Sequence, residues 1–148
     1  MFCDTMLLVV FMKNRSELRD IIIKVLYQVY ILNNTNVKYS VDTLIEEQID
    51  IENEFVKTSI DGVIKNQEDI SCLANKYLKD WTIDRLSKVD KAILSLGIYE
   101  LIYTDTPCIV CINETIELAK KYSDTEVVKM INASMDAIYH NEDMNGKD

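Results

Sequence analysis

Residues 87–103 read SKVDKAILSLGIYELIY, and this stretch decides the fold class. Its apolar positions recur at the spacing of a helix (Val89, Ala92, Ile93, Leu96, Leu101, Ile102). Ser87 and Asp90 have the spacing of a capping box, in which the Ser87 hydroxyl accepts from the Asp90 backbone N–H and the Asp90 carboxylate reaches back to Ser87. Because apolar residues cover nearly the whole circumference, we expect this helix to be the most buried element.

Further helical patterns precede this stretch. Residues 15–32 carry a broad apolar face at i, i+3 and i+4 spacing, and the polar run 33–36 ends it. Two shorter patterns cover residues 55–64 and 70–78, with Gly62 a weak point in the first. Between them and the first helix, residues 42–54 hold six acidic residues and no Lys or Arg. This run lacks the spacing of a calcium loop, so we interpret it as a solvated helix face.

Two more helices are expected after residue 103. Thr106 and Pro107 predict a start with Thr106 as the N-cap. The apolar face of that helix is expected at Ile109, Ile112, Ile116 and Ala119. Residues 123–126, SDTE, form a second capping box that begins a last helix reaching to about residue 141. The sequence therefore predicts an all-α fold of six or seven helices.

The composition limits domain number and partners. The chain has 148 residues, a size typical of one domain, and three Gly with one Pro are too few for the turns of a β-sandwich or barrel. Its 16 Lys plus Arg against 25 Asp plus Glu give a net charge of −9. Such a charge disfavours tight unaided binding to nucleic acid, unless a local basic patch or a basic partner protein overcomes it.

The two ends are expected to lie outside the main domain of residues 13–140. Residues 1–12 include the apolar run MLLVVFM, which is too short to span a bilayer. It is either a start codon assigned too early, with Met12 as the true beginning, or a short apolar arm that packs on the body or on a second copy. Residues 141–148 form a polar tail that we expect to be frayed.

The residues usually needed for catalysis or metal binding are scarce. The single histidine, His140, falls at the end of the last predicted helix, and no Gly-rich phosphate loop is present. Cys108 and Cys111 have CxxC spacing but no second pair nearby, so we interpret them as core residues. Four cysteines in a chain with an ample core indicate a reducing, cytoplasmic setting. We expect no enzyme activity, no metal and no cofactor.

The second half of the chain resembles the transcription antitermination factor NusB family. The matching elements are Arg85-Leu86, Val89-Asp90-Lys91-Ala92-Ile93-Leu94, Tyr99-Glu100-Leu101, Pro107, Ile112-Asn113-Glu114, Ile116-Glu117-Leu118-Ala119-Lys120 and Lys129-Met130-Ile131-Asn132. A weaker match at Arg19-Asp20 and Leu26-Tyr27 extends the resemblance over residues 13–140, with the acidic stretch 38–56 unmatched. The resemblance implies two small packed helical bundles without catalytic activity. It also implies binding of boxA-type single-stranded RNA in nascent ribosomal RNA transcripts, together with the small-subunit ribosomal protein NusE, to modify RNA polymerase.

The resemblance also suggests where RNA would bind. Candidate phosphate contacts at the start of the first helix are Lys13, Arg15, Arg19 and Lys24. In the last helix the candidates are Lys129 and Met130, where Met130 replaces an aromatic residue that is typical of the family and that can stack on a base. Ser16 and Glu17 also stand where the family often has Arg. Without the resemblance, the cations of the first helix are an ordinary charged face.

For the partner surface, the resemblance implies Tyr27 and Asp90, with Glu100 nearby. Each has a structural alternative, because a tyrosine on an apolar helix is by default a core residue and Asp90 belongs to the capping box. The net charge of −9 favours a basic ribosomal protein as partner. One other hypothesis stays open, a helical protein-interaction module with weakened or lost RNA binding. A third, the accessory domain of an RNA methyltransferase, is disfavoured because the sequence has no Gly-rich cofactor fold.

Overall fold

The computed structural model describes residues 13–144, 146 and 147. Within these residues the chain forms seven α-helices and one short 3-10 helix, and no strand, which confirms the all-α prediction. The elements are α2 (Arg15–Asn33), α3 (Val41–Gln48), α4 (Glu54–Lys65), α5 (Gln67–Tyr77), η1 (Ile83–Arg85), α6 (Lys88–Tyr103), α7 (Cys108–Tyr122) and α8 (Thr125–Asn141). None of these described helices has the length and apolar character to cross a membrane. The apolar run at residues 6–12 lies outside the described residues.

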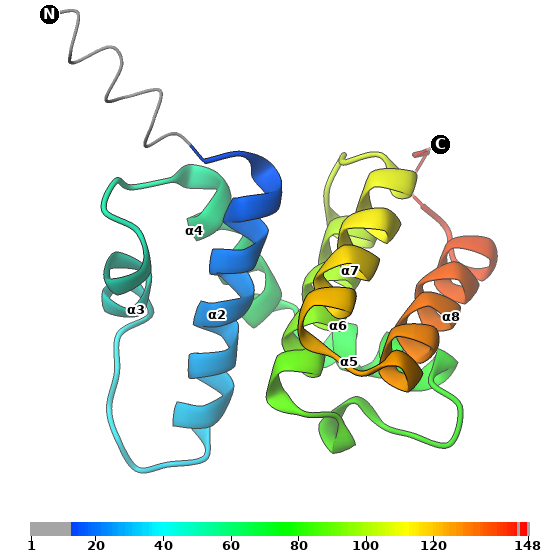
Figure 1. Cartoon of the computed structure of the whole chain (residues 1–148), viewed down its shortest axis with the longest axis horizontal. Helices are drawn as coiled ribbons and strands as arrows, with labels where there is room; N and C mark the ends of the chain where they lie inside the picture. The colour runs from blue at the N-terminus through cyan, green and yellow to red at the C-terminus, as the bar shows by residue number, and fades with distance from the viewer. Residues whose placement is uncertain (1–12, 145, 148) are drawn as a thin grey trace, which may run out of the picture.

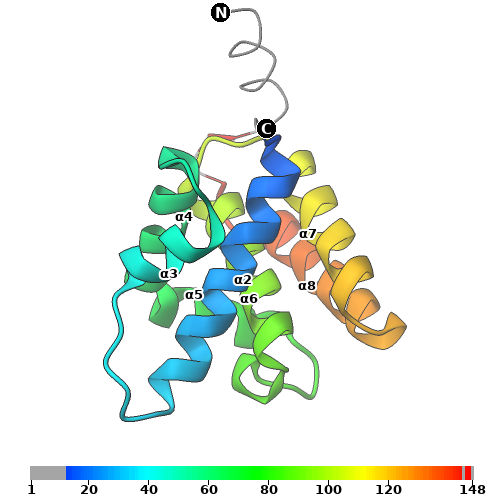
Figure 2. The ribbon, with the colours of Figure 1, turned by 60° about the vertical axis from the view of Figure 1, so that its left-hand side comes forward.

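The helices form two groups that meet along α6. Figure 1 shows α2, α3 and α4 on one side and α7 and α8 on the other. In Figure 2, α2 crosses in front of α6. Helix α6 contacts α2 and α4 from the first group and α5, α7 and α8 from the second. The central helix therefore fixes how α2, which carries Arg15, Lys24 and Tyr27, faces α7.

Helix α6 is the most buried element, as its sequence predicts. Every residue from Ala92 to Leu101 is buried. Two glycines permit close packing around it: a Cβ added to Gly62 of α4 would lie 2.3 Å from the Tyr99 ring, and one added to Gly97 would lie 2.4 Å from the Thr115 hydroxyl. Gly62 therefore sits within an unbroken helix and provides room for Tyr99, rather than weakening α4.

Polar N-caps begin several helices, though not always at the predicted residue. The Ser87 hydroxyl accepts from the Asp90 N–H at 3.1 Å, as expected. The Asp90 carboxylate, however, accepts a hydrogen bond from the Ser123 hydroxyl rather than from Ser87. Because Ser123 is committed to that contact, Asp124 caps α8 in its place by accepting from Val127 N–H at 2.9 Å. The N-cap of α7 is Pro107, one residue later than predicted.

The predicted core face of α7 is wrong at Ile109 and shifted relative to the buried positions. Ile109 is 66% exposed, and the buried positions are Cys108, Cys111, Thr115, Leu118 and Ala119. The reason lies in α6. Gly97 lets α6 and α7 approach so closely that a small side chain such as Thr115 is favoured at the point of contact. Burial of Ala119 agrees with the prediction, while Ile112 and Ile116 lie at the edge of the interface.

The described part of the tail packs on the body instead of fraying. Met144 is buried, and the Lys147 ammonium donates to the backbone carbonyls of Glu100 and Leu101 at 3.0 Å each. These carbonyls belong to the last turn of α6, where the backbone provides no further N–H donors, and the Glu100 carbonyl also accepts from the Thr104 hydroxyl at 2.6 Å. A cation at the negative end of the helix dipole also stabilises it.

Candidate nucleic-acid interface

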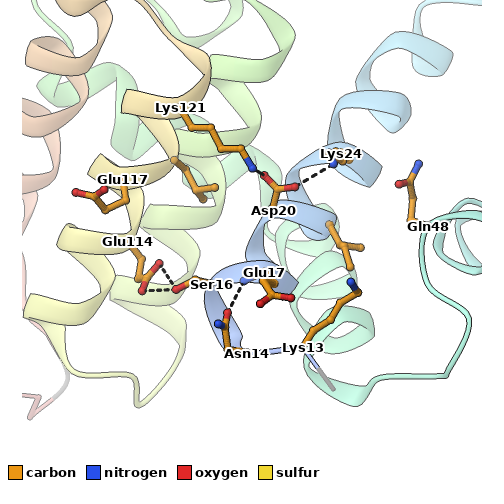
Figure 3. A pocket seen from close by; sticks show the side chains of 12 residues that line it. Lys13, Asn14, Ser16, Glu17, Asp20, Lys24, Gln48, Glu114, Glu117 and Lys121 are labelled. Carbon is orange, nitrogen blue, oxygen red and sulfur yellow. Dashed lines mark hydrogen bonds and ion pairs between the residues drawn. The ribbon is translucent and has the colours of Figure 1, made fainter. Parts of the chain in front are cut away.

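The start of α2 faces α7 across an open cleft of about 690 Å³. Lys13 and Lys24 line it from the α2 side, and Glu114, Glu117 and Lys121 line it from α7. Figure 3 shows these side chains around the opening. The Asn14 carboxamide caps α2 by accepting from Glu17 N–H at 2.8 Å, which sets where the helix begins and how its first cations are directed.

Two of the predicted RNA-binding cations are solvent-exposed at this helix start. Lys13 and Arg15 are both exposed. The guanidinium carbon of Arg15 lies 4.0 Å from the centroid of the Phe55 ring, a cation–π contact with α4. This stacking holds the guanidinium against α4 while the side chain stays exposed.

Arg19 points into the protein, which corrects the expectation that it is a surface cation. Its Nε and Nη2 donate to the two carboxylate oxygens of Glu100 at 2.7 and 2.8 Å. Arg19 is 3% exposed and Glu100 is 2% exposed. Such a desolvated bidentate pair joins α2 to α6 and leaves neither residue accessible to a phosphate or a protein partner.

Lys24 is exposed and shares the carboxylate of Asp20 with Lys121. Asp20 accepts from Lys24 at 3.0 Å and from Lys121 at 2.9 Å (Figure 3). It also accepts from the Tyr122 hydroxyl. Partial burial on its own would raise the pKa of Asp20, but the hydrogen bonds from Tyr122, Lys121 and Lys24 outweigh it and lower the pKa to about 2. The carboxylate is therefore charged at neutral pH and attracts both lysines.

Lys121 was not among the sequence-based candidates, although it is 60% exposed and lines the same cleft as Lys13. Its signal in the sequence was the Lys120-Lys121 pair at the end of α7. Carboxylates of Glu17, Glu114 and Glu117 share the cleft, and Glu114 accepts from Ser16 Oγ at 2.8 Å. The cleft thus carries interleaved charges of both signs rather than one continuous positive surface.

Lys129 and Met130 lie on a different part of the molecule from Lys13 and Arg15. They line a groove between α8 and the chain after α5, and α8 begins at the end of the molecule opposite the start of α2 (Figure 1). Lys129 is 71% exposed and contacts Glu126 at 3.7 Å, whereas Met130 is half-buried against the core. The candidate RNA contacts therefore form two separate groups.

Of the three predicted partner-binding residues, only Tyr27 is at the surface. It is 40% exposed and lines a groove of about 240 Å³ between α2, α3, α6 and the end of α7, with Val89 and Tyr122. Asp90 is 8% exposed, and its carboxylate accepts a hydrogen bond from the Ser123 hydroxyl. Glu100 is buried against Arg19. Both carboxylates are used in internal contacts, which corrects the expectation that they face a partner.

The cysteines of the CxxC pair belong to the core, as their sequence context predicts. Cys108 and Cys111 are each 1% exposed, and burial raises the pKa of the Cys111 thiol to about 12. A thiol with so high a pKa is not a nucleophile at neutral pH. Among the described residues, no group of three His, Cys, Asp or Glu side chains is arranged to hold a metal ion.

Comparison with known proteins relates most of the chain to other sequences. The transcription antitermination protein NusB of a Nitratiruptor species is 35% identical over 129 residues, covering 86% of this chain and 92% of that protein. The NusB of Methylacidiphilum infernorum is 52% identical over 65 residues, covering 43% of this chain and 46% of that protein. The second match is stronger in identity but spans less than half of either protein.

Solved structures agree with the sequence matches. A NusB structure from T. maritima has a TM-score of 0.76 at 29% identity, covering 88% of this chain and 93% of that one. A structure of antitermination factors NusB and NusE in complex with double-stranded RNA has a TM-score of 0.73 at 28% identity, covering 86% of this chain and 97% of that one. The model of the NusB family matches residues 16–140. The chain therefore belongs to the NusB family.

Proposed function

We propose that this protein is a transcription antitermination factor that binds boxA-type single-stranded RNA in nascent transcripts, jointly with the ribosomal protein NusE. The observation that carries the proposal is the likeness, over 86% of this chain, to a NusB solved together with NusE and RNA. In this role the loaded complex acts on RNA polymerase in the cytoplasm, and the protein itself catalyses no reaction.

The charge distribution supports a joint mode of binding. A chain of net charge −9 repels RNA at long range, and its cleft interleaves lysines with carboxylates. Lys13 and Arg15 provide local cations at the start of α2, but two residues supply few phosphate contacts. A basic partner on the Tyr27 groove would add cations and neutralise the negative field.

The proposal also has no need of catalytic groups. His140 is exposed at the end of α8 and lies 3.3 Å from Asp136, one helical turn away. That is the geometry of a surface pair rather than of a general base directed into a cleft.

A second candidate function is a helical protein-interaction module in which RNA recognition is weakened or lost. The observation that favours it is the internal pairing of Arg19, which leaves one fewer free cation than the sequence suggests. In this case the Tyr27 groove would keep its partner while RNA affinity would be negligible.

One titration separates the two functions. Fluorescently labelled boxA-type RNA is titrated with this protein, with the ribosomal protein, and with both together, at two salt concentrations. Antitermination by joint binding predicts tighter binding by the pair than by either protein alone, and an affinity that falls as salt rises. Complex formation between the proteins without any salt-sensitive gain in RNA affinity would support the interaction module and contradict the proposed function.

A further inference from the structure

A groove of about 780 Å³ separates α8 from the segment that follows α5. Its lining includes the apolar side chains of Met130, Ala133 and Ala137 from α8, and Trp81 from the segment after α5. Trp81 is the single tryptophan of the chain and is 49% exposed. A large indole is usually buried or in contact with a partner, so half exposure beside an apolar groove marks a binding surface.

The backbone on both sides fixes the position of Trp81. Asp80, directly before it, has a φ of 62°, a left-handed conformation that turns the chain sharply after α5. Two residues later, Ile83 is fully buried, and its N–H donates to the Asn75 side chain at 2.7 Å. The exposed indole is therefore carried by an anchored turn, which lowers the entropy lost when a ligand stacks on it.

Lysines are present at the edge of this apolar groove. Lys79 and Lys129 both line it and are both exposed. Lys129 contacts Glu126 at 3.7 Å, an exposed pair that costs little to break. The second acid of the lining, Asp124, keeps its negative charge and accepts the N-cap hydrogen bond of α8 from Val127 N–H. An exposed aromatic ring flanked by cations is the arrangement by which proteins hold single-stranded nucleic acid.

The groove also continues the proposed RNA surface, because Lys129 and Met130 line it. The Met130 thioether offers no ring on which a base could stack, whereas the indole of Trp81 lies along the same groove. We propose that the groove between α8 and the segment that follows α5 accepts a nucleobase of bound single-stranded RNA. The base stacks on Trp81 while Lys79 and Lys129 neutralise the adjoining phosphates. This inference rests on the RNA binding proposed above and assigns Trp81 as the aromatic contact of this chain.

The single tryptophan makes the contact directly measurable. Unlabelled boxA-type RNA is added to the protein, alone and with the ribosomal protein, and the fluorescence of Trp81 is recorded. In parallel, the anisotropy of labelled RNA reports binding itself. The Trp81→Phe variant gives the background from any tryptophan of the partner. Stacking predicts quenching of Trp81 emission that follows the same binding curve as the anisotropy.

Variants separate stacking from general stability. We expect Trp81→Leu, which keeps an apolar side chain but no ring, to weaken RNA binding by about tenfold, as for loss of one stacked base. Trp81→Phe should retain most of the affinity. Tyr103→Leu is the matched control, because Tyr103 is 42% exposed at the end of α6 and does not line the groove. Circular dichroism verifies that each variant is folded.

The possible failures are distinguishable. RNA binding by anisotropy without quenching, and with Trp81→Leu unaffected, would overturn the stacking proposal and leave the proposed function intact. Quenching by the ribosomal protein alone, with no further change on adding RNA, would assign the groove to that protein and also overturn it. Absence of RNA binding with and without the partner would contradict the proposed function and the inference together.

Discussion

Two neighbouring residues of α2, Arg19 and Asp20, form ion pairs in opposite environments. Arg19 turns toward α6 and pairs with Glu100, with both side chains at most 4% exposed. Asp20 turns toward α7 and attracts Lys121 and Lys24, whose side chains are 60% and 50% exposed. The first pair lies between the two helical groups, and the second lines an open cleft. Charged residues that are adjacent in the sequence therefore form pairs in different environments.

The comparison shows how burial decides what a charged residue does. Removing two charges from water is costly, so a buried pair persists only when each partner satisfies the other, as the two hydrogen bonds between Arg19 and Glu100 do. Exposed pairs are screened by water and contribute little, and they exchange readily for an incoming phosphate. Only cations of the second kind are available to RNA.

The strongest test of the difference between the buried and the exposed ion pairs is to remove one partner of the buried pair. Arg19→Ala or Glu100→Ala should each lower the free energy of unfolding by about 3–5 kcal/mol, because the remaining charge stays buried without a partner. Urea unfolding followed by circular dichroism measures the loss. The matched control is Lys121→Ala in the exposed pair, which should cost less than about 1 kcal/mol.

A double variant tests the reason for that loss. Arg19→Met combined with Glu100→Leu removes both charges and keeps apolar volume, so it should recover most of the stability. A single Arg19→Ala variant as stable as the Lys121→Ala control would show that the two environments do not differ as described.

The second largest effect is expected where α6 and α7 approach most closely. Gly97→Ala would place a Cβ 2.4 Å from Thr115 Oγ1 and 3.2 Å from Met135 Cε, and it should cost about 1–3 kcal/mol through overpacking. Thermal or urea unfolding measures this. Adding Thr115→Ala should relieve part of the cost, whereas a Gly97→Ala variant of unchanged stability would contradict the close contact.

The smallest effect concerns the pH dependence of the exposed cluster. The pKa of Asp20 is about 2 in the folded protein, against 3.8 as its ordinary value. A carboxyl with a lowered folded pKa contributes stability above its unfolded pKa, and this contribution is lost as pH falls from about 4 toward 2. We expect less than about 1 kcal/mol, because water screens the half-exposed lysines.

Comparing the urea midpoint of Asp20→Asn with that of the native chain, at neutral pH and near pH 3, tests this assignment. The difference between the two proteins should shrink on acidification. A difference that stays constant across this interval would mean that the carboxylate of Asp20 is not what the lysines stabilise.

The sequence was sufficient to predict those helices whose burial and start depend only on their own residues. Apolar residues all round predict the burial of α6, and Ser87 marks its beginning. The orientation of α7 was not accessible in this way. Hydropathy favours Ile109 as a core position, but the interface is chosen by the space at Gly97, which admits Thr115 and the small side chain of Ala119. Such a choice depends on the neighbouring helix and not on the pattern of α7 alone.

The candidate site was predictable only in part for a similar reason. Arg19 lies one helical turn after Arg15 in the same charged run. Nothing near it in the sequence indicates that its partner is Glu100, 81 residues away. Lys13 and Arg15 were candidates because cations cluster at the start of the first predicted helix and because of the family resemblance. Whether they bind RNA, as the family resemblance suggests, stays a prediction.

The measurement that tests the central claim most directly is the salt dependence of RNA affinity for the complex with the ribosomal protein. We compare the native chain with Lys13→Ala/Arg15→Ala, using Lys38→Ala/Lys65→Ala as a control, since these exposed lysines lie on the loop after α2 and at the end of α4. The slope of log affinity against log salt should become shallower by about 1.4 in the first variant, at about 0.7 for each phosphate that it no longer neutralises. The control should keep the native slope. Equal slopes for all three proteins would contradict the account.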